Sequence, residues 1–170
     1  MKKHDEAVKF AYENRMNVAD SVLNILEMKY INQLIVNCNH NIIELHDGYY
    51  YHHKGSISSF NKYAIIAGSR GDYSYIVRCI PVEDTLYSVS HGAGRKWPRH
   101  LCKGRLETKY NKEQIKTSQL GSVVITDKKE LLYEEASEAY KNIEDVIDVL
   151  LDYECIEIIA RLRPMVTYKC

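Results

Sequence analysis

One stretch has residue types that could carry out a reaction: a histidine precedes two glycines and a basic run, in Ser90-His91-Gly92-Ala93-Gly94-Arg95. Glycine lets backbone N–H groups approach an anion closely, and arginine matches phosphate oxygens in bidentate fashion. A neutral imidazole held in such a loop can attack a phosphorus atom and carry a covalent phosphoramidate. The spacing also fits an ordinary glycine turn with a solvated histidine and a basic loop.

A second histidine, His40, interrupts the strand-like segment 35–44, and Cys38 lies two residues before it on the same strand face. Imidazole is a good ligand for Mn²⁺, Zn²⁺ or Fe²⁺. A single histidine in an apolar setting is more often a hydrogen-bonded core residue than a metal ligand. Three further histidines lie in or beside a tyrosine-rich hairpin around Asp47-Gly48. They lack metal-ligand spacing, so we expect them at the surface: His46, His52 and His53.

Two Gly/Ser loops, 54–59 and 67–75, flank an expected strand at 63–66. Glycine and hydroxyl groups beside Lys54 and Arg70 suit contacts with phosphate or a nucleotide, although such clusters are also ordinary turns. Neither loop has Walker A spacing, and no G-x-G-x-x-G opens a helix after a strand. The usual nucleotide-binding folds are therefore not supported.

The elements that must position these residues form a mixed pattern. Apolar residues at helical spacing predict a helix over 5–28 whose stripe packs on a core, and another over 134–151. The polar stretch 103–119 is helix or loop. Short strands are expected at 75–80, 123–125 and 166–168. This pattern predicts a mixed α+β fold, and the absence of repeats and linkers predicts a single domain over residues 1–170.

Bulk composition limits the classes of partner. The 170 residues carry 23 Lys and Arg against 23 Asp and Glu, so any nucleic-acid surface must be a local patch. Five scattered cysteines without a C-x-x-C pair favour a reducing cytoplasm over a disulfide scaffold. No apolar run approaches membrane-spanning length, so no membrane partner is expected.

Taken together, these segments resemble one family, the RtcB-type RNA ligases, which join RNA ends using GTP and Mn²⁺. The resemblance runs in family order, at family-like intervals, from about residue 8 to the end. Arg70 and Lys96-Trp97 resemble the subgroup associated with a release-factor-like protein, which would be a partner. The matching segments are Asn39-His40-Asn41, Lys54-Gly55-Ser56-Ile57-Ser58, Gly68-Ser69-x-Gly71, Ser74-Tyr75, Ser90 to Arg95, Ala139-Tyr140-Lys141 and Lys169.

The resemblance implies a role for each matched residue. His91 would be the guanylylated nucleophile and His40 a Mn²⁺ ligand. Lys54 and Arg95 would contact RNA or phosphate. The nucleotide would contact Asn41, Ser69, Ser74, Gly92, Ala93, Gly94, Tyr140 and Lys169. The implied reaction joins an RNA 3′-phosphate or 2′,3′-cyclic phosphate to a 5′-hydroxyl, as in RNA repair or tRNA splicing.

Departures from the family pattern bear on activity. Family members are more than twice this length, and their N-terminal half supplies an Asp, a bridging Cys and two His that have no counterpart before residue 31. The chain thus resembles the C-terminal half of a ligase, whether a split-gene product, a fragment or a decayed copy. It would need a separate N-terminal half as partner, or would be a non-catalytic nucleotide- or RNA-binding remnant. A phosphohydrolase with an unrelated histidine site is disfavoured by the ordered motifs.

Two structural expectations follow from the resemblance. Four site residues should converge on one concave surface: His40, Ser69, His91 and Lys169. In addition, the surface around His40 should be open or unusually apolar, because residues of the missing half would have packed there.

Overall fold

The computed structural model describes residues 1–28 and 34–169. It has the expected mixed α+β fold, with four α-helices and several small sheets. The helices are α1 (Lys2–Ile25), α2 (Arg99–Leu106), α3 (Lys129–Glu134) and α4 (Ile143–Asp152), with 3-10 turns η1 (Glu83–Thr85), η2 (Gln114–Lys116) and η3 (Ser137–Ala139).

Within these ranges the strands pair into three antiparallel sheets and one parallel pair. Their orders are β1-β2, β3-β6, β4-β5-β8 and β7-β9, the last being parallel. The strands are β1 (Asn41–His46), β2 (Tyr49–Lys54), β3 (Ser56–Ser58), β4 (Tyr63–Ile66), β5 (Ser74–Cys79), β6 (Ser88–Ser90), β7 (Val123–Thr126), β8 (Ile156–Leu162) and β9 (Val166–Lys169). Strands β4, β5, β7 and β9 confirm the segments expected at 63–66, 75–80, 123–125 and 166–168 to within about a residue.

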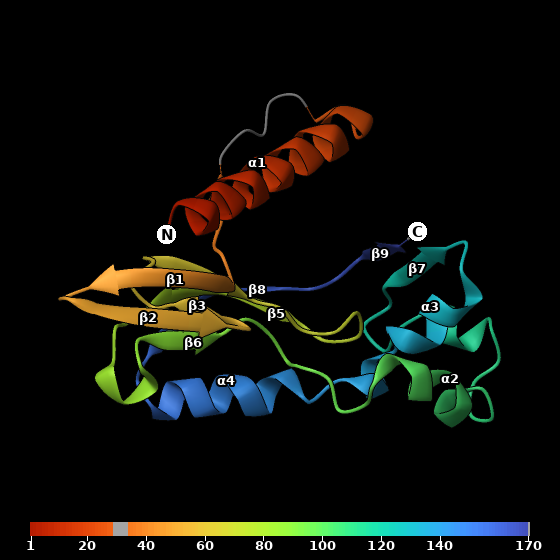
Figure 1. Ribbon diagram of the computed structural model, residues 1–170. Coiled ribbons are helices and arrows are strands. Elements are labelled where there is room, and N and C mark those ends of the chain that lie inside the picture. The colour runs from red at the N-terminus through yellow and green to blue at the C-terminus, as the bar shows by residue number, and fades with distance from the viewer. Residues whose placement is uncertain (29–33, 170) are drawn as a thin grey trace.

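The buried apolar side chains of the described residues form two clusters. The larger joins the β3-β6 and β4-β5-β8 sheets to α4, and it includes Ile57, Val77 and Ile147. The smaller lies among α2, α3 and β7, and it includes Leu106 and Leu132. In Figure 1 the elements around the two clusters form two bodies side by side, and the connection from β8 to β9 crosses from the first to the second, where β9 pairs with β7.

The β1-β2 hairpin follows directly from its turn residues. Asp47 and Gly48 both have positive φ, 49° and 83°, as a two-residue type I′ turn requires. His46 therefore faces Tyr49, and the register continues to Asn41 opposite Lys54. The strand begins only at Asn41, so the strand-like pattern expected from residue 35 is wrong over 35–40.

The long helix expected over 134–151 is interrupted. Helix α4 begins at Ile143 behind an Asn142 cap, whose side chain accepts a hydrogen bond from the Glu144 N–H. Upstream, α3 ends at Glu134 and Tyr140 is extended, at φ −111° and ψ 158°. The break arises because backbone partners far along the chain compete with helical ones: Lys141 donates to the Gly94 carbonyl, and Lys96 to the Ala139 carbonyl.

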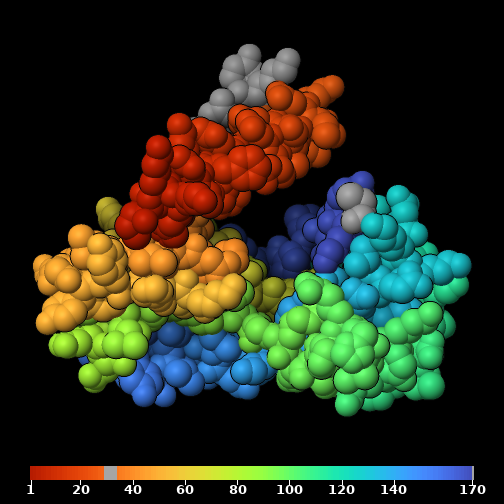
Figure 2. All heavy atoms as spheres, in the orientation of Figure 1, coloured from red at the N-terminus to blue at the C-terminus, as the bar shows by residue number. Residues whose placement is uncertain are grey.

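Helix α1 also differs from expectation. It spans Lys2–Ile25 rather than 5–28, and none of its residues is buried, so the expected packing of its apolar stripe on a core is wrong. Figure 2 shows the helix standing off from the body of the molecule. It is attached by polar contacts: Arg15 donates to the Asn37 and Asn39 side chains, and the Ile43 N–H donates to His4.

Helix α2 accounts for only the first residues of the polar stretch 103–119, which continues as turns and η2. Within the described ranges, no helix combines the length and apolarity needed to cross a bilayer.

Candidate functional site

A pocket of about 550 Å³ lies where the histidine loop, the β4–β5 loop and the residues around β9 meet. It contains three of the four residues expected to converge on one concave surface, Ser69, His91 and Lys169, and the ring of the fourth, His40, lies beside that of His91. The pocket is lined by Ala67, Gly68, Ser69, Arg70, Ser74, His91, Gly92, Ala93, Gly94, Arg95, Arg99, Glu135, Tyr140, Pro164, Thr167 and Lys169.

Backbone pairing holds the histidine loop in place. Ala67 donates to the His91 carbonyl at 3.2 Å, and Ala93 donates back to the Ala67 carbonyl at 2.9 Å. The close approach requires glycine at position 92, because a Cβ there would lie 2.6 Å from the Ala67 oxygen. Gly94 has a φ of +70°, which also favours glycine. The loop therefore presents His91 from a backbone position that leaves little freedom.

The imidazoles of His91 and His40 lie together, with ring centroids 5.1 Å apart and planes tilted by 32°. Desolvation, followed by the neighbouring His40, lowers the pKa of His91. The neutral form of His91 is thus favoured near neutral pH, and an imidazole can act as a nucleophile only in that form. Gly55 lies against the His91 ring, since a Cβ there would be 3.5 Å from Nε2.

The β4–β5 loop forms one wall of the pocket through tight backbone packing. A Cβ at Gly68 would lie 2.0 Å from the Tyr73 carbonyl oxygen, and the Gly68 N–H donates to the Ser74 hydroxyl. The buried Ser69 hydroxyl donates to Asp72 at 2.5 Å and accepts from the Gly71 N–H. Ser69 and Ser74 therefore line the pocket while their hydroxyls also stabilise the loop.

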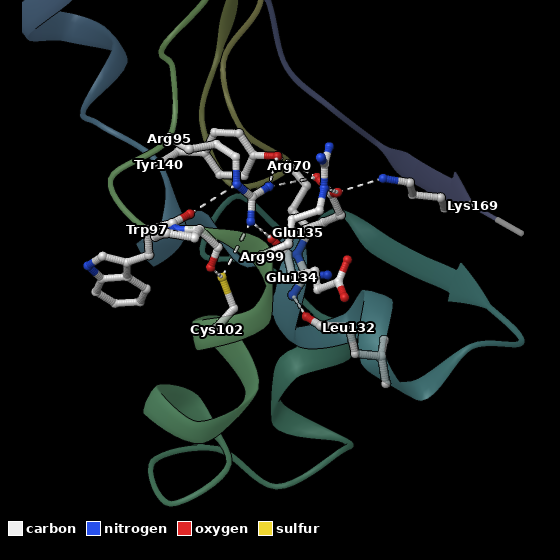
Figure 3. Close-up of polar contacts among 11 residues, drawn as sticks. Arg70, Arg95, Trp97, Arg99, Cys102, Leu132, Glu134, Glu135, Tyr140 and Lys169 are labelled. Atoms are coloured by element: carbon white, nitrogen blue, oxygen red, sulfur yellow. Dashed lines mark hydrogen bonds and ion pairs between the residues drawn. The ribbon is translucent and has the colours of Figure 1, made fainter.

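Arg95 points into the protein rather than away from it (Figure 3). Its guanidinium donates to the Tyr140 hydroxyl, the Trp97 and Glu134 carbonyls and the Cys102 sulfur. Most of its N–H donors are thus used in hydrogen bonds within the protein. This geometry favours a role in positioning Tyr140 over a role in binding an RNA phosphate.

A residue that the sequence did not single out, Glu135, organises the far wall. Its carboxylate accepts from Lys169 Nζ at 2.5 Å and from the Tyr140 hydroxyl, and it lies 3.7 Å from both Arg95 and Arg99 (Figure 3). Burial alone would raise the pKa of Glu135, but hydrogen bonds from Lys169 and Tyr140 lower it overall. Burial and Glu135 in turn raise the pKa of Tyr140 to about 12.

Two expected contact residues lie outside the pocket lining. Asn41 is exposed and accepts a hydrogen bond from the Gly55 N–H, and Lys54 is exposed at the end of β2. Both neighbour His91 through Gly55.

His40 is the metal ligand that the sequence predicts in this chain. Among the residues that the structure describes, no three His, Cys, Asp or Glu side chains come together as a metal-binding group. His40 is exposed beside His91, whereas Cys38 packs against the larger apolar cluster. The described part of the chain therefore does not fit a complete Mn²⁺ site.

The prediction of a surface position is wrong for one of the hairpin histidines. His53 is buried rather than at the surface, hydrogen-bonded to the Ser88 hydroxyl at 2.9 Å with Glu44 beside its other nitrogen. Its face of the hairpin packs on β6, which alternation within the short strand did not reveal.

The chain around His40 is open, as expected. His40 itself is exposed, and the preceding Leu34 and Ile35 present their apolar side chains to solvent. Apolar residues of α1, the residue that follows it and β8 are exposed as well: Phe10, Val18, Val22, Ile25, Leu26, Ile158, Ile159 and Leu162.

Comparisons with known proteins agree with the motif pattern. The family model described as tRNA-splicing ligase RtcB matches residues 1–170. The chain is 41% identical to RNA-splicing ligase RtcB2 of Escherichia coli over 98% of its own length and 45% of that protein. It is 35% identical to RtcB1 of Escherichia coli and 36% identical to the tRNA-splicing ligase RtcB of Methanocaldococcus jannaschii, covering 32% and 11% of those proteins. The chain thus spans less than half the length of these relatives.

Proposed function

The chain belongs to the RtcB family of RNA ligases, and on that premise we propose that it is the nucleotide-binding and nucleophile-bearing part of a GTP-dependent ligase. The ligase joins an RNA 3′-phosphate or 2′,3′-cyclic phosphate to a 5′-hydroxyl, in RNA repair or tRNA splicing. The observation that carries the proposal is the placement of His91, with a lowered pKa, at a pocket with a glycine-rich backbone on one side and cations on the other.

His91 is the group that reacts. The neutral imidazole attacks the α-phosphorus of GTP, pyrophosphate leaves, and GMP remains bonded to the ring nitrogen. A terminal RNA 3′-phosphate then takes the GMP and frees His91, and a 5′-hydroxyl displaces GMP to close the strand. A cyclic phosphate must first be opened by water.

The pocket walls supply binding and charge compensation. Tyr140 and Lys169 offer a phenol and an ammonium for the guanosine, both held by Glu135. The backbone of Gly92, Ala93 and Gly94 faces the phosphates, with Arg99 at the pocket mouth. Such prearranged donors are the largest source of stabilisation for charge that develops during phosphoryl transfer.

Mn²⁺ is expected for the family, and His40 is the ligand that this chain offers. Because the described residues do not form a complete metal site, no step is assigned to a metal held by this chain alone. We propose that the remaining ligands come from a complementing N-terminal half. The exposed apolar faces of α1 and β8 are the surface that such a half covers.

The incomplete metal group also favours a second candidate, a non-catalytic nucleotide- or RNA-binding remnant. The two candidates differ in whether a covalent bond forms at His91.

Labelling with α-³²P GTP tests the proposal directly. We expect radioactivity to remain on the protein after denaturation when Mn²⁺ and a complementing N-terminal half are present, and to be weak or absent without that half. Losing even one donor that stabilises transition-state charge costs about a hundredfold in rate.

Two histidine variants make the test specific. His91→Ala should abolish labelling, whereas His52→Ala, which changes an exposed histidine outside the pocket, should leave it unchanged. Labelling that survives His91→Ala would show that the nucleophile is misassigned. Nucleotide binding without any labelling under all conditions would favour the remnant.

A further inference from the structure

Charge is distributed very unevenly along this neutral chain. Residues 95–129 contain ten Lys and Arg but only three Asp and Glu, a net charge of +7, so the remaining residues carry −7. This stretch forms α2, the turns after it and β7, and it reaches the start of α3, all within the smaller of the two bodies in Figure 1. A protein without net charge therefore concentrates positive charge on one body.

The basic residues are continuous with the pocket. Arg99 lines the pocket at the start of α2, and Lys103 follows four residues later on the same face of that helix. Lys103 Nζ lies 3.9 Å from the Glu130 carboxylate at the start of α3, which brings it next to Lys129. A row of cations thus runs from the pocket mouth along α2 to α3.

Like charges are crowded at the end of this row. Lys129 first, then burial, Lys103 and Lys116 lower the pKa of Lys112, because the ammonium groups stand close together. The ion pairs of Lys103 with Glu130 and of Lys116 with Glu113 involve exposed side chains. They therefore neutralise the cluster only weakly. Crowded ammonium groups on a surface favour a ligand with several negative charges.

We propose that this basic face, made up of Lys103, Lys112, Lys116 and Lys129, binds the phosphate backbone of the RNA beside the ends to be joined. RNA is favoured because the row of cations begins at the pocket where the RNA end would react, and because a phosphate chain offers charges at regular spacing. The contacts are sequence-independent, and they hold the RNA rather than take part in chemistry. This proposal rests on the proposed function, which supplies the RNA substrate.

Salt-dependent RNA binding by the whole chain tests the proposal. The probe is a fluorescent RNA stem–loop cleaved once in its loop, titrated with protein at several monovalent salt concentrations in the absence of GTP. Each phosphate contact contributes about 0.7 to 0.9 to the slope of log K against log salt. Replacing the four lysines of the basic face with Gln should therefore reduce the slope by about 3 and weaken binding by at least tenfold at about 0.1 M salt.

A charge-matched control variant changes four exposed lysines elsewhere to Gln: Lys2, Lys3, Lys9 and Lys62. Its RNA affinity and the salt dependence of that affinity should stay close to those of the unmodified chain. The single variant Lys112→Glu should lower affinity without altering folding, because its side chain is exposed. Equal loss in both fourfold variants, an unchanged slope in the basic-face variant, or no RNA binding by the unmodified chain would overturn the proposal.

GTP labelling of the same variants separates this proposal from the function it rests on. Without RNA, the basic-face variant should be guanylylated as well as the unmodified chain, since its lysines are outside the pocket lining. Loss of RNA binding with intact labelling assigns the basic face to RNA. Failure of labelling in every protein, with the salt effect intact, would count against the catalytic proposal alone.

Discussion

Replacing Glu135 with Gln should weaken the wall that holds Tyr140 and Lys169. The change keeps the size of the side chain but removes the charge that Lys169, Arg95 and Arg99 face. Only 16% of the Glu135 side chain is exposed, whereas 40% of the Lys169 side chain is, so the interactions of Glu135 are screened unequally.

The expected change in the free energy of unfolding follows from these contacts. A hydrogen bond to a charged group contributes about 1.5–3 kcal/mol, and the Lys169 contact must be discounted toward the lower values of solvent-exposed pairs. Glutamine retains a carbonyl oxygen that can still accept from Tyr140. We therefore expect Glu135→Gln to lower the free energy of unfolding at neutral pH by about 1–3 kcal/mol.

The loss should depend on pH with a definite sign. Because the folded pKa of Glu135 lies below the ordinary 4.5, ionised Glu135 stabilises the fold above about 4.5. That contribution is lost as pH falls through the lowered folded pKa. The difference between Glu135→Gln and the unmodified protein should therefore be full at neutral pH and shrink as the solution is acidified below about 4.5.

Urea unfolding of both proteins across this pH range measures the effect, with Glu157→Gln as the matched control. Glu157 pairs with Arg78 on the surface, where both side chains are about half exposed, so its loss should be distinctly smaller. Equal losses in the two variants, or a Glu135→Gln difference that persists in acid, would refute the reasoning.

Two further predictions concern the loop and the domain. Gly92→Ala should abolish labelling of His91 by GTP, because its Cβ would meet the Ala67 carbonyl at 2.6 Å. Gly94→Ala, strained by about 1 kcal/mol at its positive φ but facing open space, should reduce labelling less. We also propose that residues 1–170 are a single domain that unfolds in one calorimetric transition, because Arg70, in the β4–β5 loop of the larger body, donates to the Ile115 and Leu132 carbonyls of the smaller one. Two resolved transitions would contradict this, and Arg70→Ala should lower the melting temperature.

Local signals in the sequence were sufficient where a structure depends on neighbouring residues. The Asp47-Gly48 turn, the strands on either side of the 67–75 loop and the glycines after His91 each follow from backbone preferences within a few residues. The motif order was sufficient to identify the family, which the comparisons confirm.

Helix ends and burial depended on partners far along the chain. The segment before α4 has helical periodicity, yet the Gly94 carbonyl and the Lys96 N–H recruit Lys141 and Ala139 into a bridge more than 40 residues apart in sequence. His53 is buried because β6 covers its face of the hairpin. Helix α1 has an apolar stripe but no buried residue. An apolar stripe indicates that a helix can pack, but it does not show that another element of the chain packs against it.

The residue types of the site were readable from the sequence, but their connections were not. His91, Tyr140 and Lys169 were named from the ordered set of motifs that resembles the family, whereas Glu135 belongs to none of those motifs and stands out only through the cations that surround it. Charge behaves in the same way: composition determines a net charge of zero, and folding alone brings Lys103, Lys116 and Lys129 close to Lys112. Backbone preferences depend on adjacent residues and can be predicted from them, whereas electrostatic and hydrogen-bonding partners depend on tertiary packing.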